Sequence, residues 1–343
     1  MSPKTVLVTG ISGFVGSHVA KAFLDRDWIV VGTVRSAKKG DDLLRQPAFA
    51  KAAEEKRIRY VVVEDLVSSD FRPAMEGVDA LAHTASPFHF DGKNFADYAE
   101  PAIKGTSNVL EAAKEFSQIK AVVVTSSFVA IVNREPPTQQ AHRVYTEEDW
   151  LPIGYEEAEA QTNPGVWYCA SKKFAEMKAW EIKESGASWS MATICPPMIF
   201  GPVIHTTALN SLNESSGQLY RLLSGQTNQG EIPETVFPAC SDVCDVAEAH
   251  VEAIIQQSTG RFLVSSSEYD NQRVVDFIRE RFPEASGRAP IGNPGKHYLR
   301  EDIYQLDPKK AVNTFGLKIK TFDQVFGDTI QQYLEIEKAS VAV

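Results

Sequence analysis

The chain has 343 residues, enough for one large domain or two ordinary ones, with 43% hydrophobic residues and a net charge of −10. Nucleic acids and anionic membranes bind to proteins with a basic surface. An acidic chain is not expected to offer one, so neither partner is expected. No run approaches the ~18 apolar residues of a membrane span, and the N-terminal segment has no signal-peptide pattern. With 4 cysteines in a chain of this length, reduced thiols and a cytoplasmic location are expected.

Short apolar runs alternate with helical patterns through the first part of the chain. Because strands buried on both faces form nearly continuous apolar runs, this alternation predicts parallel strands joined by helices. The predicted strands span 5–9, 29–34, 60–63, 80–83, 121–125 and 190–195, and the predicted helices 14–26, 38–56, 68–76 and 94–117. The sequence therefore predicts an α/β fold with a doubly wound parallel sheet of the Rossmann type.

The pattern becomes less regular after residue 196. Helices are predicted at 214–224, 243–257, 274–282, 308–315 and 322–338, with a short strand at 261–265. We predict a nucleotide-binding domain over 1–196 and a smaller, mainly helical substrate domain over 197–343. Residues 243–265 are expected to return to the first domain.

A glycine-rich turn follows the first predicted strand, with Gly10, Gly13 and Gly16 at three-residue spacing. Such a turn lets backbone N–H groups approach a pyrophosphate at the start of a helix. The spacing differs from the usual Gly-x-Gly-x-x-Gly, and an ordinary turn between strand and helix is the alternative. The residues predicted to bind a dinucleotide here are Gly10, Ser12, Gly13, Phe14, Val15 and Gly16.

The end of the second strand indicates which dinucleotide is bound. NAD enzymes place an acid there, whereas an arginine accommodates the 2′-phosphate of NADP. Arg35 occupies this place, and no acid occurs before Asp41. Its planar guanidinium suits phosphate, so NADPH is predicted, with a solvated basic loop as the alternative. Lys39 is expected to assist. Asp65 and Leu66, after the third strand, are expected to contact the adenine, with an ordinary turn at the strand end as the alternative.

Tyr168 and Lys172 stand four residues apart in a run that reads as helix, so they share one face. A lysine ammonium beside a phenol favours the phenolate and lowers its pKa. Bringing a tyrosine from a pKa of ~10 to ~7 needs roughly 4 kcal/mol. A phenol tuned in this way donates a proton at neutral pH. The pair arises by chance in many helices, so its meaning depends on the other motifs.

Together these motifs resemble the extended short-chain dehydrogenase/reductase family. Within it, the chain is most similar to fungal aldehyde and ketone reductases of the methylglyoxal type and to plant dihydroflavonol and cinnamoyl-CoA reductases. The stretches that carry the resemblance are the glycine turn, Thr33–Ser36, His83–Phe88, Pro101–Thr106, Thr125–Ser127, Tyr168–Glu176, Cys195–Pro197 and Asp242–His250.

The resemblance implies that NADPH delivers a hydride to a carbonyl carbon. Tyr168 would protonate the oxygen, Lys172 would tune the tyrosine and bind the nicotinamide ribose, and Ser127 would hold the carbonyl oxygen. Ser126 is the competing serine. Strand alternation sends the two to opposite faces, so only one can serve, and Ser127 is chosen by the family motif alone. The further cofactor residues implied are Thr84, Ala85, Ser86, Thr125, Pro196 and Met198.

The predicted substrate is an aromatic or aliphatic aldehyde or ketone, bound in a large apolar pocket with few polar groups. Candidate pocket residues are Phe88, Phe90, Phe128, Val129, Trp167, Met198 and Tyr220, with core packing as the alternative for each. The segment 133–165 is expected to act as a lid or substrate loop. No metal is expected, since His142, His205 and His297 lack partners at metal-binding spacing. A monomer and a homodimer both remain open.

Two departures from the family pattern stand out. Ala102 replaces an asparagine that many extended members use in proton relay, and Cys244 replaces an arginine between Asp242 and Asp245. Alternative functions are a nucleotide-sugar epimerase or dehydratase, which would favour an acid in place of Arg35, and a non-catalytic NADPH sensor.

Overall fold

The structure, a computed structural model, describes residues 3–86, 92–206, 208–227, 231–298 and 300–341. Its largest sheet contains β1 (Thr5–Thr9), β2 (Ile29–Val34), β3 (Ile58–Val62), β4 (Ala80–His83), β5 (Ala121–Thr125), β7 (Ser190–Cys195) and β10 (Gly260–Leu263). Among the described residues this sheet has 7 strands in the order β10-β7-β5-β4-β1-β2-β3, and every neighbouring pair is parallel. The strand order reverses between β1 and β4, where doubly wound sheets bind ligands beyond their carboxyl ends.

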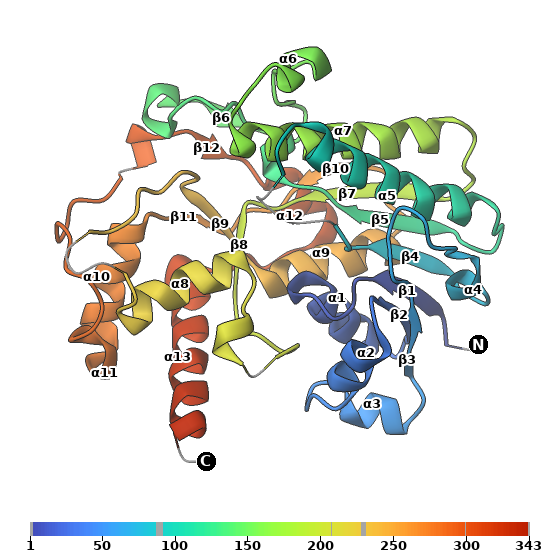
Figure 1. Cartoon of the computed structure of the whole chain (residues 1–343), viewed down its shortest axis with the longest axis horizontal. Coiled ribbons are helices and arrows are strands. Elements are labelled where there is room, and N and C mark those ends of the chain that lie inside the picture. Colours follow the sequence, from blue (N-terminus) through green and yellow to red (C-terminus); the bar gives the residue numbers. More distant parts are fainter. Residues whose placement is uncertain (1–2, 87–91, 207, 228–230, 299, 342–343) are drawn as a thin grey trace.

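Helices cover both faces of this sheet (Figure 1). One face carries α4 (Arg72–Met75), α5 (Ala96–Lys114) and α7 (Pro164–Glu184), and its buried cluster includes Met75, Leu110 and Trp189. The other face carries α1 (Phe14–Leu24), α2 (Ala37–Leu44), α3 (Ala50–Glu54), α9 (Val243–Ile255) and α12 (Lys309–Phe315). The two layers of helices explain why the strands are apolar on both sides.

The remaining elements gather beside the carboxyl end of the large sheet (Figure 1). A small sheet has the order β11-β9-β8, from Ser267–Glu268, Ala239–Asp242 and Met198–Phe200. Around it pack α8 (Glu214–Ser224), α10 (Asn271–Arg281), α11 (Pro283–Ser286) and α13 (Phe322–Val341). Elsewhere lie β6 (Val144–Tyr145) paired with β12 (Gln305–Leu306), α6 (Tyr155–Glu159), and the short 3-10 helices Phe128–Ala130, Pro137–Gln140, Leu209–Ser211 and Arg300–Asp302.

The predicted fold class is confirmed, and most predicted strands match closely. The helix predicted over 38–56 is wrong as one element, because the chain forms α2 and α3 with Pro47 between them. Proline lacks the N–H that a continuous helix would need there. Strands β8 and β9 were not predicted, since they are 3 and 4 residues long and β9 includes Ser241 and Asp242. The predicted domain division stays a prediction; β10 is an edge strand of the large sheet, and α9 packs against that sheet.

Among the described residues, no helix combines the length and the apolar character needed to cross a membrane.

Candidate active site

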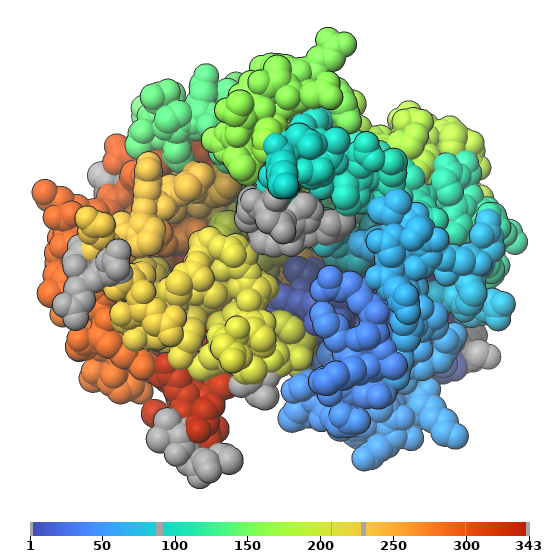
Figure 2. Space-filling model, viewed as in Figure 1, coloured from blue at the N-terminus to red at the C-terminus, as the bar shows by residue number. Residues whose placement is uncertain are grey.

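A cleft of about 760 Å³ lies where the carboxyl ends of the large sheet meet α8 and the small sheet. Figure 2 shows the surface hollowed between the yellow residues beyond 200 and the blue N-terminal residues. The cleft brings together most of the residues predicted from sequence. Those that line it are Gly10, Gly13, Phe14, Val15, Gly16, Thr84, Ser86, Thr125, Ser127, Phe128, Val129, Tyr168, Lys172, Pro196 and Met198.

The glycine turn forms a cradle that side chains would fill. Gly10 has a φ of +66°, and a Cβ on Gly16 would lie 2.4 Å from the carbonyl oxygen of Gly10. Helix α1 begins directly after Gly13. The first N–H groups of any helix have no intrahelical partner, and Gly13 supplies no side-chain cap for them. These features fit a dinucleotide pyrophosphate at the start of α1.

The ends of β1 and β4 are tied together at the floor of the cleft. Thr9 Oγ1 accepts from the backbone N–H groups of Thr84 and Ala85, both at 3.1 Å, and lies 2.8 Å from His83 Nδ1. Burial, with a smaller effect from the charge of Lys172, lowers the pKa of His83 to about 4. His83 is therefore neutral at physiological pH and serves this tie between strands.

The residues predicted to select the cofactor lie outside the cleft itself, at the neighbouring ends of β2 and β3. Arg35 is exposed, and no carboxylate of the described residues lies within 4.0 Å of it. Lys39, exposed beside it, donates its backbone N–H to Ser36 Oγ at 3.5 Å. The carboxylate of Asp65 accepts from the hydroxyl and N–H of Ser68, which lowers its pKa. The other predicted cofactor residues that do not line the cleft are Ser12, Leu66 and Ala85.

The two serines after β5 have different partners. The Ser126 hydroxyl is buried and donates to Glu176 Oε2 at 2.5 Å. The Ser127 hydroxyl is half-buried in the cleft, where it accepts weakly from the N–H of Val129 at 3.3 Å. Both serines line the cleft, but the Ser126 hydroxyl is occupied by the Glu176 carboxylate, whereas the Ser127 hydroxyl has only the weak contact with Val129.

Tyr168 and Lys172 lie on one face of α7, with Lys172 Nζ 5.7 Å from the centre of the Tyr168 ring. Lys172 Nζ donates to Ser86 Oγ at 2.5 Å. Burial raises the pKa of Tyr168, with a smaller effect from Cys169, and lowers the pKa of Lys172 to about 8. The expected lowering of the tyrosine pKa is therefore absent from this geometry, because burial raises the pKa and dominates the shift. Tyr168 is protonated at neutral pH, which is the form that donates a proton.

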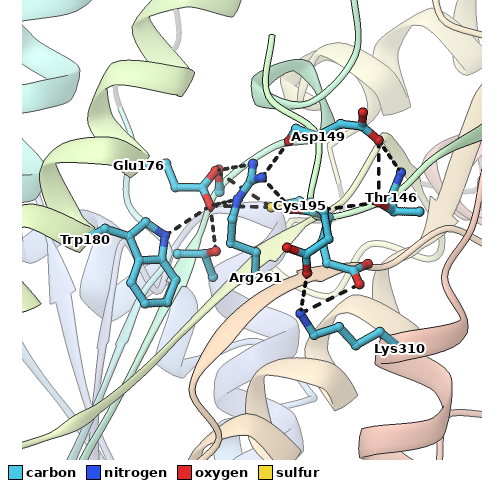
Figure 3. A network of polar contacts seen from close by, with 11 residues as sticks. Thr146, Asp149, Glu176, Trp180, Cys195, Arg261 and Lys310 are labelled. Carbon is cyan, nitrogen blue, oxygen red and sulfur yellow. Dashed lines mark hydrogen bonds and ion pairs between the residues drawn. The ribbon is translucent and has the colours of Figure 1, made fainter.

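A network of polar contacts surrounds Glu176 and Arg261 (Figure 3). Glu176, two turns beyond Tyr168 on α7, pairs with Arg261 of β10 at 2.7 Å, and their side chains are 0% and 10% exposed. Its carboxylate also accepts from Ser126 and from Thr193 Oγ1 at 2.7 Å. The Glu176 carboxylate thus connects α7 to β7, to β10 and to the residue that follows β5.

The Asp242–His250 motif supports the site from α9. His250 Nε2 lies 2.7 Å from Thr125 Oγ1, and Thr125 lines the cleft. At the start of α9, Lys320 Nζ lies 3.2 Å from the buried carboxylate of Asp242, and the Lys320 N–H donates to Asp245 at 3.0 Å. Cys244 supplies no cation at this place, and Lys320, from a distant part of the chain, pairs with Asp242 instead.

Comparison with known proteins identifies the scaffold. Residues 7–255 match the model of the 3-beta hydroxysteroid dehydrogenase/isomerase family. The chain belongs to this family. It is an extended short-chain dehydrogenase/reductase, as the sequence motifs predicted.

Named relatives are similar over nearly the whole chain. A ketoreductase of Aspergillus niger is 34% identical, covering 97% of this chain and 98% of the relative. A cinnamoyl-CoA reductase of Medicago truncatula is 30% identical, with 98% and 97% covered. The crystal structure of the yeast methylglyoxal/isovaleraldehyde reductase complexed with NADPH matches with a TM-score of 0.87 and 30% identity, covering 97% of this chain and 99% of that one.

Not every predicted pocket residue of this extended reductase scaffold reaches the cleft. Trp167 is buried in a separate cluster, where its Nε1 donates to the carbonyl of Gln161 at 3.1 Å. The Tyr220 hydroxyl, on α8, donates to Glu337 at 2.9 Å. Neither side chain lines the cleft, because each faces a neighbouring helix or loop. Phe88 and Phe90 lie outside the described residues.

The segment 133–165 is held to the rest of the protein by hydrogen bonds from Arg261 and Lys173. The Arg261 guanidinium donates to the carbonyl oxygens of Glu147 and Asp149 at 2.5 and 2.6 Å. Lys173 Nζ donates to the carbonyls of Leu151 and Ile153 at 2.9 and 2.7 Å. From this segment, Arg134 and Gly165 line the cleft. Its predicted role as a lid stays a prediction.

Sequence reasoning missed the cleft wall formed by residues beyond 198. These residues come from α8, from β8, from the first residue of α10 and from loops without periodic pattern, so only the folded chain shows that they lie near the site. They are Ile199, Asn213, Glu214, Ser215, Gln218, Arg221, Leu222, Thr227, Pro233, Glu234, Thr235, Val236, Phe237, Tyr269 and Asn271.

Two other sequence features can be placed. Ala102 is buried on α5, so it offers no polar group for a proton relay. Within the described ranges, no group of three or more histidine, cysteine or acidic side chains is placed to hold a metal ion.

Proposed function

We propose that this chain is an NADPH-dependent reductase that converts an aldehyde or ketone into an alcohol, with Ser127, Tyr168 and Lys172 as its catalytic residues. The observation that supports these roles is that the glycine turn, Ser127 and the Tyr168–Lys172 pair all line one cleft. The relatives confirm the enzyme class and the cofactor, since methylglyoxal reductases of this family are NADPH-dependent.

NADPH supplies the hydride when it is bound. The Ser127 hydroxyl donates a hydrogen bond to the carbonyl oxygen and stabilises the negative charge that develops there. Tyr168, protonated because of its burial, then transfers its phenolic proton to that oxygen. An alkoxide is a stronger base than a phenolate, so the transfer is downhill even with a raised tyrosine pKa.

Lys172 carries the positive charge of the site. It donates to Ser86 beside the glycine turn, where it is placed to bind the nicotinamide ribose. Its charge lies on the same helix face as Tyr168 and favours the phenolate left after proton transfer. The lysine therefore acts after the proton has moved rather than by lowering the resting pKa.

The substrate is a small carbonyl compound, and we expect the enzyme to act in the cytoplasm as a monomer or homodimer. The cleft residues Phe128, Val129 and Met198 provide apolar surface for it. Phe128 packs edge-on against Phe237, with ring centres 5.0 Å apart. An aromatic wall of this kind suits a flat or branched carbonyl substrate.

The experiment assays a panel of aldehydes, diketones, aryl ketones and thioesters. The rate of oxidation of NADPH, and separately of NADH, measures the reduction of each compound. Turnover with NADPH and a strong preference over NADH are expected. Arg35→Ala should weaken NADPH binding by about tenfold or more, since a charged hydrogen bond to the 2′-phosphate is lost, and should leave NADH binding nearly unchanged.

Lys38→Ala is the matched control, because Lys38 is exposed near Arg35 and already pairs with Asp42 at 2.6 Å. It should alter NADPH binding little. An equal or better rate with NADH would refute the assignment of Arg35. NADPH binding without turnover of any compound would favour a sensor.

A further inference from the structure

Arg134 brings a positive charge into the cleft that neither the cofactor motifs nor the catalytic residues require. It follows the 3-10 helix Phe128–Ala130 and lines the cleft together with Ser127 and Tyr168. Its Nη2 lies 3.1 Å from the place that a Cβ on Gly165 would occupy. Gly165 is one helical turn before Tyr168 on α7, so this charge stands beside the reaction centre.

The loop that carries Arg134 is held in place. The Arg134 N–H donates to Asn133 Oδ1 at 2.6 Å, and the Asn133 N–H donates to the Tyr145 hydroxyl at 3.2 Å. Gln140 Nε2 donates to the carbonyl of Glu135 at 2.5 Å. The guanidinium lies 5.3 Å from the centre of the Phe237 ring. Its direction is therefore set by the fold.

The guanidinium is incompletely satisfied by the protein. Nε of Arg134 is buried and has no hydrogen-bond partner. Among the described residues, no carboxylate lies within 4.0 Å of Arg134, whereas Arg221, which also lines the cleft, lies 3.7 Å from Glu214. The exposed Glu234 on the cleft wall is also beyond that distance. The side chain of Arg134 does hydrogen-bond to Cys169, but that thiol is neutral, because burial raises its pKa to about 11. The positive charge of Arg134 therefore has no protein counter-ion among the described residues, and an oxyanion bound in the cleft would compensate it.

We propose that Arg134 binds a carboxylate of the substrate, so that this enzyme prefers carbonyl compounds that carry a negative charge close to the reacting carbonyl. This inference rests on the proposed reductase function and narrows its substrate class to keto acids and aldehyde acids. Arginine suits the role because its planar fork binds a carboxylate through two parallel hydrogen bonds. The Phe128 and Phe237 rings then pack against the apolar part of the same molecule.

The test compares each acid with its own methyl ester, which has nearly the same shape but no charge. One pair is benzoylformate and methyl benzoylformate, and the second is 4-carboxybenzaldehyde and methyl 4-formylbenzoate, in which the charge is further from the carbonyl. Rates of NADPH oxidation give kcat/KM for wild type, Arg134→Met and Arg134→Lys.

Wild type should favour the acid in at least one pair. Arg134→Met should lower kcat/KM for that acid by about tenfold or more through KM, and should leave the ester nearly unchanged. Arg134→Lys should fall between the two because it keeps the charge without the fork. Unfolding temperatures would confirm that each variant is folded.

Arg143→Met is the matched control. Arg143 lies on the same segment, outside the cleft, and pairs with Asp149 at 3.0 Å. Its loss removes one positive charge nearby and should not change the ratio of acid to ester. Esters reduced as well as their acids in both pairs, or an equal loss on acid and ester in Arg134→Met, would overturn the charged-substrate inference while leaving the reductase intact. If NADPH bound but no carbonyl compound in either pair or the wider panel were reduced, the proposed function itself would fail.

Discussion

At the scale of single residues, burial decides the chemistry of the site. Tyr168 and Lys172 both lie in a partly desolvated cleft, which raises the pKa of the phenol and lowers that of the ammonium. The residue types and their spacing were visible in the sequence. Their pKa directions were not, because desolvation depends on chain segments far away in sequence.

The pH dependence of NADPH capture should report the charge on Lys172. The pKa of Lys172 is lowered to about 8, so its side chain is positively charged below this pH and neutral above it. We expect kcat/KM for NADPH, which reports the free enzyme, to fall as the pH rises through about 8. Steady-state rates across a pH series would measure this.

Lys172→Arg provides the comparison, because an arginine keeps its charge throughout this range. Its kcat/KM, although lower, should show no such fall. An identical inflection in Lys172→Arg would show that another group is responsible.

At the scale of elements, helix α7 carries the site and the Glu176–Arg261 pair fastens it. The face of α7 that bears Tyr168 and Lys172 continues one turn further to Glu176. That carboxylate contacts residues of β7 and β10 and the residue after β5. The helix and these strands were predicted from sequence, whereas the buried pair was not, since Glu176 and Arg261 are 85 residues apart and only the sheet order makes them neighbours.

Breaking this pair should destabilise the protein strongly. Glu176→Gln leaves Arg261 buried without a compensating charge, and we expect a loss of about 3–5 kcal/mol in the free energy of unfolding. Urea unfolding would measure it. The double variant Glu176→Gln/Arg261→Met should recover part of the loss, because no buried charge is then left alone.

Lys178→Ala on the same helix is the surface comparison. Lys178 pairs with Glu181 at 2.6 Å, and the side chain of Glu181 is 67% exposed, so its removal should change stability by about 1 kcal/mol or less. A Glu176→Gln variant as stable as Lys178→Ala would contradict the role given to the network.

At the scale of the whole molecule, the first half was far easier to predict than the second. Strands buried on both faces and the glycine turn leave strong local patterns, so the sheet and the cofactor edge could be predicted. The cleft wall beyond residue 198 combines α8, which was predicted, with the short strand β8 and irregular loops, which have no periodic pattern. Arg134 and Phe237, about a hundred residues apart in the chain, meet only in the folded protein.

The central claim is that this cleft reduces a carbonyl compound with Tyr168 as the proton donor. The most direct measurement is NADPH oxidation by wild type and Tyr168→Phe with the best substrate of the panel, together with NADPH binding to each. The phenylalanine keeps the ring but has no proton to give, so turnover should fall by about a hundredfold or more while the NADPH dissociation constant stays nearly the same. A Tyr168→Phe enzyme that retained wild-type turnover would contradict the account.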